Sequence, residues 1–206
     1  MTSDDIRDQK NDHLLTPENA ALVIIDYQPV QVSSVKNIDP ETLKKNILNV
    51  ARIAKLYNLP IVLSTVNVAT GANEPTISEL TDILGEDVTP IDRTTINSWE
   101  DGDFRKAVEA TGRKKLIMTA LWTEACLSMP VLDALDNGYE VYPVADAVGG
   151  TSKDAHDIAL RRMENAGAQS IGWVQLACEL QRDWNREDTA KEFANILFGE
   201  HGINGK

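Results

Sequence analysis

Three residues of this sequence have the side-chain types that nucleophilic catalysis needs: Asp26, Arg93 and Cys126. Chemistry at a cysteine requires a thiolate, a group that moves protons and a positive neighbour that lowers the pKa of the thiol. We therefore predict Asp26 as general base toward the thiol and later toward water, and Arg93 as the cation that holds the thiolate and the charge developing on a substrate. Backbone amides near Trp122 and Cys126 are predicted to form an oxyanion hole. The competing interpretation is structural: Asp26 and Arg93 anchor loops, and Cys126 is a small buried thiol.

The cysteine lies in the segment KKLIMTALWTEACLSMP, residues 114–130. Residues 115–119 form a continuous apolar run, which predicts a strand that is buried on both faces, as in a parallel sheet. Thr123 is predicted to be the N-cap of the following helix. Because helix N-terminal amides favour a negative charge, we expect the pKa of Cys126 to lie below that of a free thiol.

The rest of the chain alternates between predicted strands and predicted helices. Besides residues 115–119, strands are predicted at residues 20–26, 60–66, 139–146 and 168–173, and a brief strand is predicted to begin at residue 89. Helices are predicted at residues 40–57, 77–84, 100–110 and 152–166. One more helix is predicted to follow residue 123, and two others to begin at about residues 174 and 188. Such alternation predicts a single-domain, doubly wound α/β fold, with a parallel sheet of about six strands and helices on both faces. Pro143 indicates an edge strand. Parallel strands place ligands outside their carboxyl ends, where Asp26, Arg93 and Cys126 all fall.

Composition limits the classes of partner. The 206 residues carry a formal net charge of -12, with 20 Lys and Arg against 32 Asp and Glu, which argues against binding to nucleic acid or to an anionic membrane. Without an export signal or a transmembrane-length apolar run, we expect a cytoplasmic protein with free thiols. Residues 1–15 are predicted to form a polar surface arm that a neighbouring subunit orders, and residues 16–206 the domain.

The three histidines, His13, His156 and His201, do not have the spacing of metal ligands, and the loop at residues 67–75 contains no histidine. We therefore predict no metal and no cofactor. His156 is predicted to be a surface or interface residue of its helix, and Cys178 a packed structural thiol.

Five segments resemble isochorismatase-like cysteine hydrolases of the YcaC-like branch: ALVIIDYQ, NLPIVLST, INSWED, TALWTEAC and GAQSIGWVQLACELQRDW. The resemblance covers residues 16–183. It implies that Asp26 is the base and that Cys126 is the nucleophile, attacking an amide or carbamoyl carbon of a small molecule to form a thioacyl-enzyme. It also implies a cis peptide at Leu121–Trp122 that turns the Trp122 amide toward the oxyanion, and a ring-like homo-oligomer, with an octamer as the candidate.

Arg93 departs from the family pattern, because most of the superfamily has lysine in this position of the triad. Arginine stabilises charge but does not readily donate a proton, since its pKa exceeds 12. It also favours a substrate carboxylate that it would bind through two hydrogen bonds. Two other functions therefore stay open: isochorismatase-type vinyl ether hydrolysis, and a catalytically idle oligomeric or thiol-sensing protein. Trp122 and Asn97 are predicted to line the substrate pocket, Asn97 also by orienting the Arg93 loop.

Overall fold

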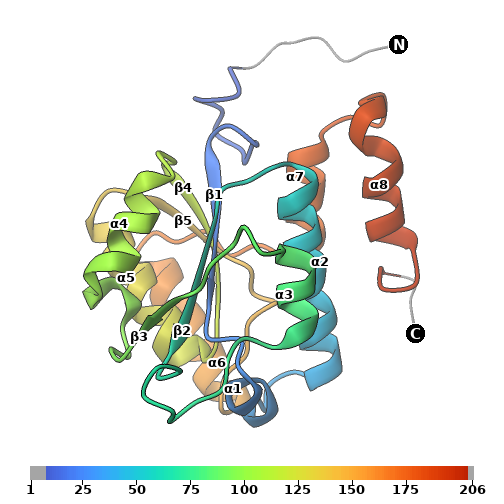
Figure 1. Cartoon of the computed structure of the whole chain (residues 1–206). Coiled ribbons are helices and arrows are strands. Elements are labelled where there is room, and N and C mark those ends of the chain that lie inside the picture. Colours follow the sequence, from blue (N-terminus) through green and yellow to red (C-terminus); the bar gives the residue numbers. More distant parts are fainter. Residues whose placement is uncertain (1–7, 204–206) are drawn as a thin grey trace.

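The computed structural model describes residues 8–203, so the first seven residues of the predicted arm lie outside the described part. The chain folds around a parallel sheet of five strands in the order β3-β2-β1-β4-β5 (Figure 1). The strands are β1 (Ala20–Ile25), β2 (Ile61–Val66), β3 (Ile91–Arg93), β4 (Lys115–Ala120) and β5 (Glu140–Pro143). The predicted doubly wound α/β fold is confirmed, and Pro143 does lie in an edge strand.

Every residue of the central strand β1 and of its neighbour β4 is buried. Because successive side chains of a strand point to opposite faces, β1 supplies Leu22 and Ile24 to one hydrophobic core and Val23 and Ile25 to the other. A continuous apolar run is therefore needed to fill both cores, which explains why these strands show no polar alternation.

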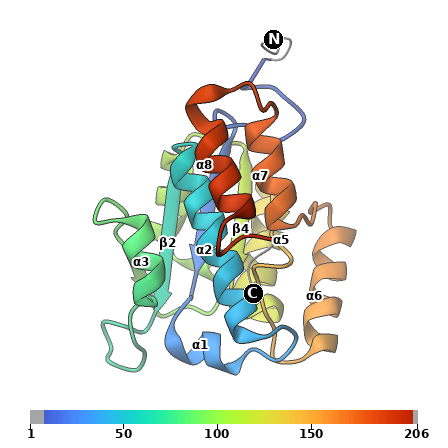
Figure 2. The same ribbon diagram turned by 90° about the vertical axis from the view of Figure 1, so that its right-hand side faces the viewer.

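Helices cover both faces of the sheet (Figures 1 and 2). One core is closed by α2 (Pro40–Leu56), α3 (Ser78–Leu84), α7 (Trp173–Gln181) and α8 (Glu187–Phe198), and the other by α4 (Gly102–Ala110), α5 (Ser128–Asp136) and α6 (Lys153–Asn165). Figure 2 shows α8 as the outermost helix, against α2 and α7. As its sequence predicts, α2 begins after an Asp39 cap, whose carboxylate accepts a hydrogen bond from the Thr42 amide at 2.9 Å. The sequence analysis missed the short α1 (Pro29–Ser34).

The predicted sixth strand, residues 168–173, is not a strand in the structure; it makes only an isolated bridge to the end of β5. The Ile171 amide donates to the Pro143 carbonyl at 2.9 Å, and the Ala145 amide donates to the Ile171 carbonyl at 2.8 Å. Pro143 itself has no N–H, so the ladder loses the bond that this residue would donate. The sheet therefore has five strands rather than six.

Residues 8–15 are held by the chain itself. The amide of the fully buried Leu15 donates to the Glu179 carboxylate at 2.9 Å, and Arg182 donates to the Leu15 carbonyl at 3.1 Å. Lys115 donates to the His13 carbonyl at 2.6 Å. These bonds tie residues 13–15 to β4 and α7 of the same chain, and a contact between the arm and a neighbouring subunit stays a prediction. No helix within residues 8–203 is both long enough and apolar enough to cross a membrane.

The prediction for Cys178 is wrong, because this thiol is exposed on α7. Trp173, Leu176 and Leu180 form the buried stripe of the helix, and Cys178 lies off that stripe. Cys178 is therefore open to reagents, which matters for any experiment that labels the buried Cys126.

Candidate active site

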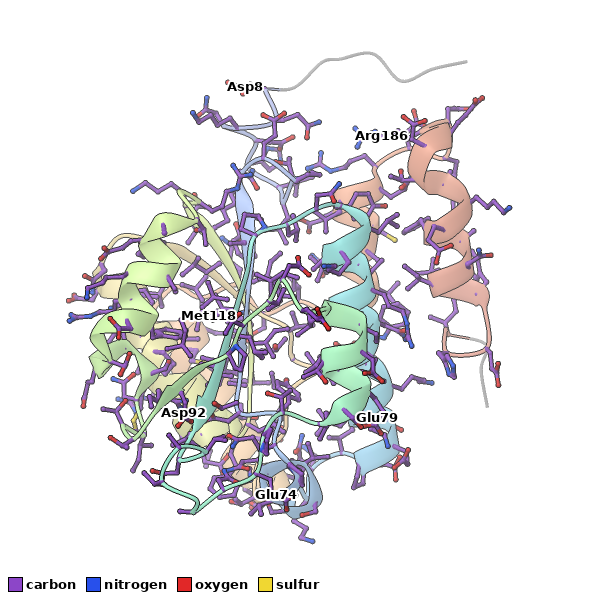
Figure 3. The ribbon with its side chains drawn as sticks, in the orientation of Figure 1. Asp8, Glu74, Glu79, Asp92, Met118 and Arg186 are labelled. Carbon is purple, nitrogen blue, oxygen red and sulfur yellow. The ribbon has the colours of Figure 1, made fainter. Side chains whose placement is uncertain are left out.

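The sheet brings the three predicted catalytic residues to one edge. Asp26 directly follows β1, Arg93 is the last residue of β3, and Cys126 follows β4 in a single π-helical turn, η2 (Thr123–Leu127). The strands are parallel and in register, so their carboxyl ends meet at the lower end of the sheet in Figure 1. Figure 3 places Asp92, the neighbour of Arg93, at this end. The topology therefore assembles the site from three separate strands.

Asp26 and Arg93 form a completely buried ion pair. Arg93 Nη1 donates to Asp26 Oδ1 at 2.7 Å and Nη2 donates to Oδ2 at 2.8 Å, and both side chains are 0% exposed. The Asp26 backbone has a φ of 61°, a left-handed conformation that costs a residue other than glycine about 1–2 kcal/mol. The surrounding structure therefore holds this carboxylate in an orientation that the chain would not adopt by itself.

Arg93 has further acceptors on the neighbouring strand and loop. Its guanidinium donates to Ser64 Oγ at 3.1 Å, to the Thr65 carbonyl at 3.0 Å and to the Ile96 carbonyl at 3.3 Å. Burial by itself would lower the pKa of Arg93, but the hydrogen bonds and the charge of Asp26 outweigh it and raise that pKa. Both terminal nitrogens contact Asp26, whereas Nε has no hydrogen-bond partner among the described residues. A preference for a substrate carboxylate stays a prediction.

Cys126 lies beside this pair and is only 8% exposed. Burial, followed by the charge of Asp26 and a hydrogen bond to it, raises the pKa of the thiol to about 12, although Arg93 and a hydrogen bond from the Trp122 amide act in the opposite direction. The expected depressed pKa is therefore wrong: the loss of solvent outweighs the helix terminus. The resting thiol is protonated, and its attack on a substrate needs a base.

The turn before Cys126 has an unusual backbone. The Leu121–Trp122 peptide is cis, as the family resemblance implies. The Leu127 amide donates to the Trp122 carbonyl at 3.2 Å, which closes the π-helical turn. Trp122, not Thr123, is the N-cap residue, and its side chain makes no capping bond. The half-buried Trp122 ring is fixed by a hydrogen bond from its Nε1 to Ser34 Oγ at 2.8 Å.

Asn97 lies in the loop after β3 and begins the short 3-10 helix η1 (Ser98–Glu100). Its Nδ2 donates to Asp133 Oδ2 at 2.7 Å, and its Oδ1 accepts from the Trp99 amide at 3.1 Å. These bonds tie the loop that follows Arg93 to α5. A contact between Asn97 and substrate stays a prediction.

The sequence analysis missed two groups of residues that hold the site. The Ser64 hydroxyl and the Thr65 carbonyl accept from Arg93, and the polar Ser64 within an otherwise apolar strand was the available signal. His156 is buried, not on the surface, and its Nδ1 lies 2.9 Å from Thr123 Oγ1. No local pattern pairs residues 33 positions apart, so only the fold reveals this contact.

The histidines and acidic residues are dispersed. Among residues 8–203, no three His, Cys, Asp or Glu side chains are grouped closely enough to hold a metal ion. His13 is exposed near Asp12, whereas His156 is buried against the η2 turn.

Comparisons with known proteins identify the family of this chain. The Isochorismatase domain family matches residues 20–175. A probable hydrolase, YcaC of Escherichia coli strain K12, is 38% identical over 98% of this chain and 91% of its own length.

Two solved structures share the fold at similar identity. YcaC from Pseudomonas aeruginosa, with hexane-2,5-diol and covalent acrylamide, matches with a TM-score of 0.85 and 38% identity over 91% of each chain. The crystal structure of Escherichia coli YcaC, an octameric hydrolase of unknown specificity, matches with a TM-score of 0.85 and 36% identity, over 93% of this chain and 94% of that one. With the site and the fold in agreement, this chain belongs to the isochorismatase-like hydrolase family.

Proposed function

We propose that this protein is a cysteine hydrolase that cleaves the C–N bond of a small amide or carbamoyl compound through a thioacyl-enzyme on Cys126. The observation that carries the proposal is the electrostatic coupling of the buried Cys126 thiol to Asp26, which raises the pKa of the thiol, while Arg93 holds the Asp26 carboxylate at 2.7 and 2.8 Å. A nucleophile, a base in contact with it and a third group that orients the base are the parts that nucleophilic catalysis requires.

In the acylation step, Asp26 takes the thiol proton while Cys126 Sγ forms a bond to the carbonyl carbon. The electron pair of the carbonyl moves to its oxygen, where backbone amides of Trp122 and Cys126 stabilise the charge. The Trp122 amide is near enough to the thiol to lower its pKa, so it lies close to where this oxyanion would form. Collapse breaks the C–N bond, and Asp26 returns its proton to the departing nitrogen as ammonia or an amine leaves.

In the deacylation step, Asp26 takes a proton from water, and the oxygen of that water attacks the thioester carbon. The C–S bond then breaks, the carboxylic acid product leaves, and the sulfur recovers its proton from Asp26. Asp26 is therefore the base in both half-reactions. No step requires Arg93 to release a proton, so the replacement of the family lysine by arginine is compatible with catalysis. Arg93 orients Asp26 through two hydrogen bonds.

The thiol-sensing alternative fits the site less well. Redox-sensing cysteines have a low pKa and an accessible sulfur. Cys126 has the opposite properties, with a pKa raised to about 12 and 8% exposure. Vinyl ether hydrolysis would leave the contact between the thiol and Asp26 without a role.

We also propose that the protein forms a homo-oligomer, with an octamer as the form supported by its similarity to octameric Escherichia coli YcaC. A cytoplasmic location fits the two cysteines, which are both free thiols. The proposed pocket includes the half-buried Trp122 and Asn97. Acrylamide is covalently bound in the structure of Pseudomonas aeruginosa YcaC, and we propose that it alkylates Cys126 of this chain.

The test is a panel of small primary amides and N-carbamoyl compounds, with ammonia release and the intact mass of the protein measured together. The expected result is ammonia release accompanied by an acyl mass increase on the peptide that contains Cys126. Both are lost in Cys126→Ala and kept in Cys178→Ser. If Cys126→Ala releases ammonia at the parent rate, the thioacyl mechanism is wrong.

A further inference from the structure

The turn that carries the nucleophile is bound to the segment between β5 and α6 and to the beginning of α6. The Thr123 amide donates to the Gly149 carbonyl at 2.8 Å, and Thr123 Oγ1 lies 2.9 Å from His156 Nδ1. The next residue, Glu124, accepts from the amide of Thr151 at 2.9 Å and from its hydroxyl at 2.6 Å. Two successive residues of the η2 turn are therefore fixed to a segment that is distant in the sequence.

The contact between Thr123 and His156 is enclosed. Both residues are buried, and burial lowers the pKa of His156, so that the imidazole is neutral near pH 7. A neutral ring leaves one nitrogen able to accept a proton and the other able to donate one. Gly150 lies between Glu124 and His156. A Cβ added to this glycine would lie 2.6 Å from Glu124 Oε2 and 3.2 Å from His156 Cβ. This close fit leaves the turn little freedom to shift.

The η2 turn needs such support because its own backbone offers little. Its N-cap residue makes no side-chain capping bond, and a π-helical turn is rarely stable by itself. The turn nevertheless has to place both the Trp122 amide and the Cys126 thiol, since the amide faces the sulfur and the sulfur faces Asp26. Displacement of reacting groups by about 1 Å can reduce a catalysed rate by about a hundredfold.

We propose that Thr123 and His156 are positioning residues, whose hydrogen bond holds the η2 turn so that the Cys126 thiol stays aligned with Asp26. The inference rests on the proposed function, because it concerns the transfer of the thiol proton to Asp26. Neither residue touches the thiol or a substrate. Their effect is on the geometry between nucleophile and base.

The experiment measures an Asp26 effect, defined as the rate constant for acrylamide labelling of Cys126 with Asp26 present, divided by that in Asp26→Asn. Labelling is followed by peptide mass spectrometry at pH 7, in a Cys178→Ser background that removes the exposed thiol. The Asp26 effect is then measured again in Thr123→Val and in His156→Leu, which delete the hydrogen bond with little change in volume. Ile158→Ala, at an exposed position of α6, is the control.

We expect Thr123→Val and His156→Leu each to reduce the Asp26 effect by about tenfold, and the double variant to reduce it no further, because both changes remove one bond. His156→Asn, which keeps an amide group near the Nδ1 position, is expected to restore most of the effect. A role limited to general stability would slow or speed labelling equally with and without Asp26, leaving the ratio unchanged.

The outcomes separate the two proposals. If the background protein shows a clear Asp26 effect that Thr123→Val and His156→Leu leave intact, the positioning inference is wrong and the proposed function stands. If the background protein shows no Asp26 effect at all, the proposed base is wrong and both proposals fail. Urea unfolding of every variant identifies any that do not fold; for such a variant the other single substitution, which deletes the same hydrogen bond, provides the test.

Discussion

Replacement of Arg93 by methionine should destabilise the protein strongly, because it leaves the carboxylate of Asp26 buried and without its cation. Both side chains are 0% exposed, and two hydrogen bonds of 2.7 and 2.8 Å are lost. Removing one partner of a buried ion pair costs about 3–5 kcal/mol. Arg93→Lys keeps a positive charge but loses part of the paired geometry, so we expect a smaller cost of about 1.5–3 kcal/mol.

The assay is urea unfolding at one fixed protein concentration, since an oligomer makes the apparent stability depend on concentration. Thermal melting gives a second measurement. In a chain of this size each kcal/mol of lost stability shifts the melting temperature by about 2–4 °C, so Arg93→Met should lower the melting temperature by about 6–20 °C. Lys106→Met is the matched control: Lys106 pairs with Asp103, but the two side chains are 76% and 80% exposed. We expect that variant to change stability by less than about 0.5 kcal/mol.

The double variant Asp26→Asn/Arg93→Met provides the decisive comparison. With a neutral amide in place of the carboxylate, the unpaired buried charge is gone, so the double variant should be more stable than Arg93→Met alone. An unfolding free energy of Arg93→Met within about 1 kcal/mol of the parent value would contradict this prediction. A double variant that is less stable than Arg93→Met by the full cost of a second independent change would contradict it as well.

Three further predictions concern single residues. Because the pKa of Cys126 is raised from 9.0 to about 12, the folded state keeps a proton that the unfolded state has lost, so stability falls as pH rises from about 9 to 12. In Cys126→Ala the free energy of unfolding, measured with urea from pH 8 to 11, should fall less steeply with pH than in the parent. The same slope in both proteins would contradict the raised pKa of Cys126. Asn97→Leu removes the 2.7 Å bond to Asp133 and should cost about 1.5–3 kcal/mol, which thermal melting would show; no loss means that the loop is held otherwise. Phe104→Ala, at a fully buried position, should cost about 3–5 kcal/mol in the same assay, whereas Ile158→Ala should change little, and equal effects would contradict the assigned core.

The sequence was sufficient to locate the strands that carry the site. The apolar runs before Asp26 and Cys126 are long enough to identify strands that are buried on both faces, and the alternation with helices fixes their parallel direction. Since parallel strands end at one edge, the proximity of Asp26, Arg93 and Cys126 followed from topology without any side-chain geometry. The prediction of a sixth strand was wrong because the effect of Pro143 on the hydrogen bonds of the sheet depends on which segment lies beside Pro143.

The electrostatics of the site could not be predicted in the same way. The sequence places Cys126 near a helix start, which suggests a lowered pKa, but the pKa depends on how completely the fold removes water, and that is a property of the packed structure. The burial of His156 and the exposure of Cys178 were both missed for a related reason: a helix face can be assigned from periodicity only when the neighbouring element is known.

The central claim, that Asp26 is the base for Cys126, is tested most directly by one comparison at pH 7: acrylamide labelling of Cys126 in Cys178→Ser and in Cys178→Ser/Asp26→Asn. The account predicts that loss of Asp26 slows labelling by at least about tenfold, because the thiol loses the group that accepts its proton. If Asp26 acts only as a nearby negative charge, its removal lowers the pKa of the thiol and labelling becomes faster. Faster labelling in the asparagine variant would therefore contradict the mechanism.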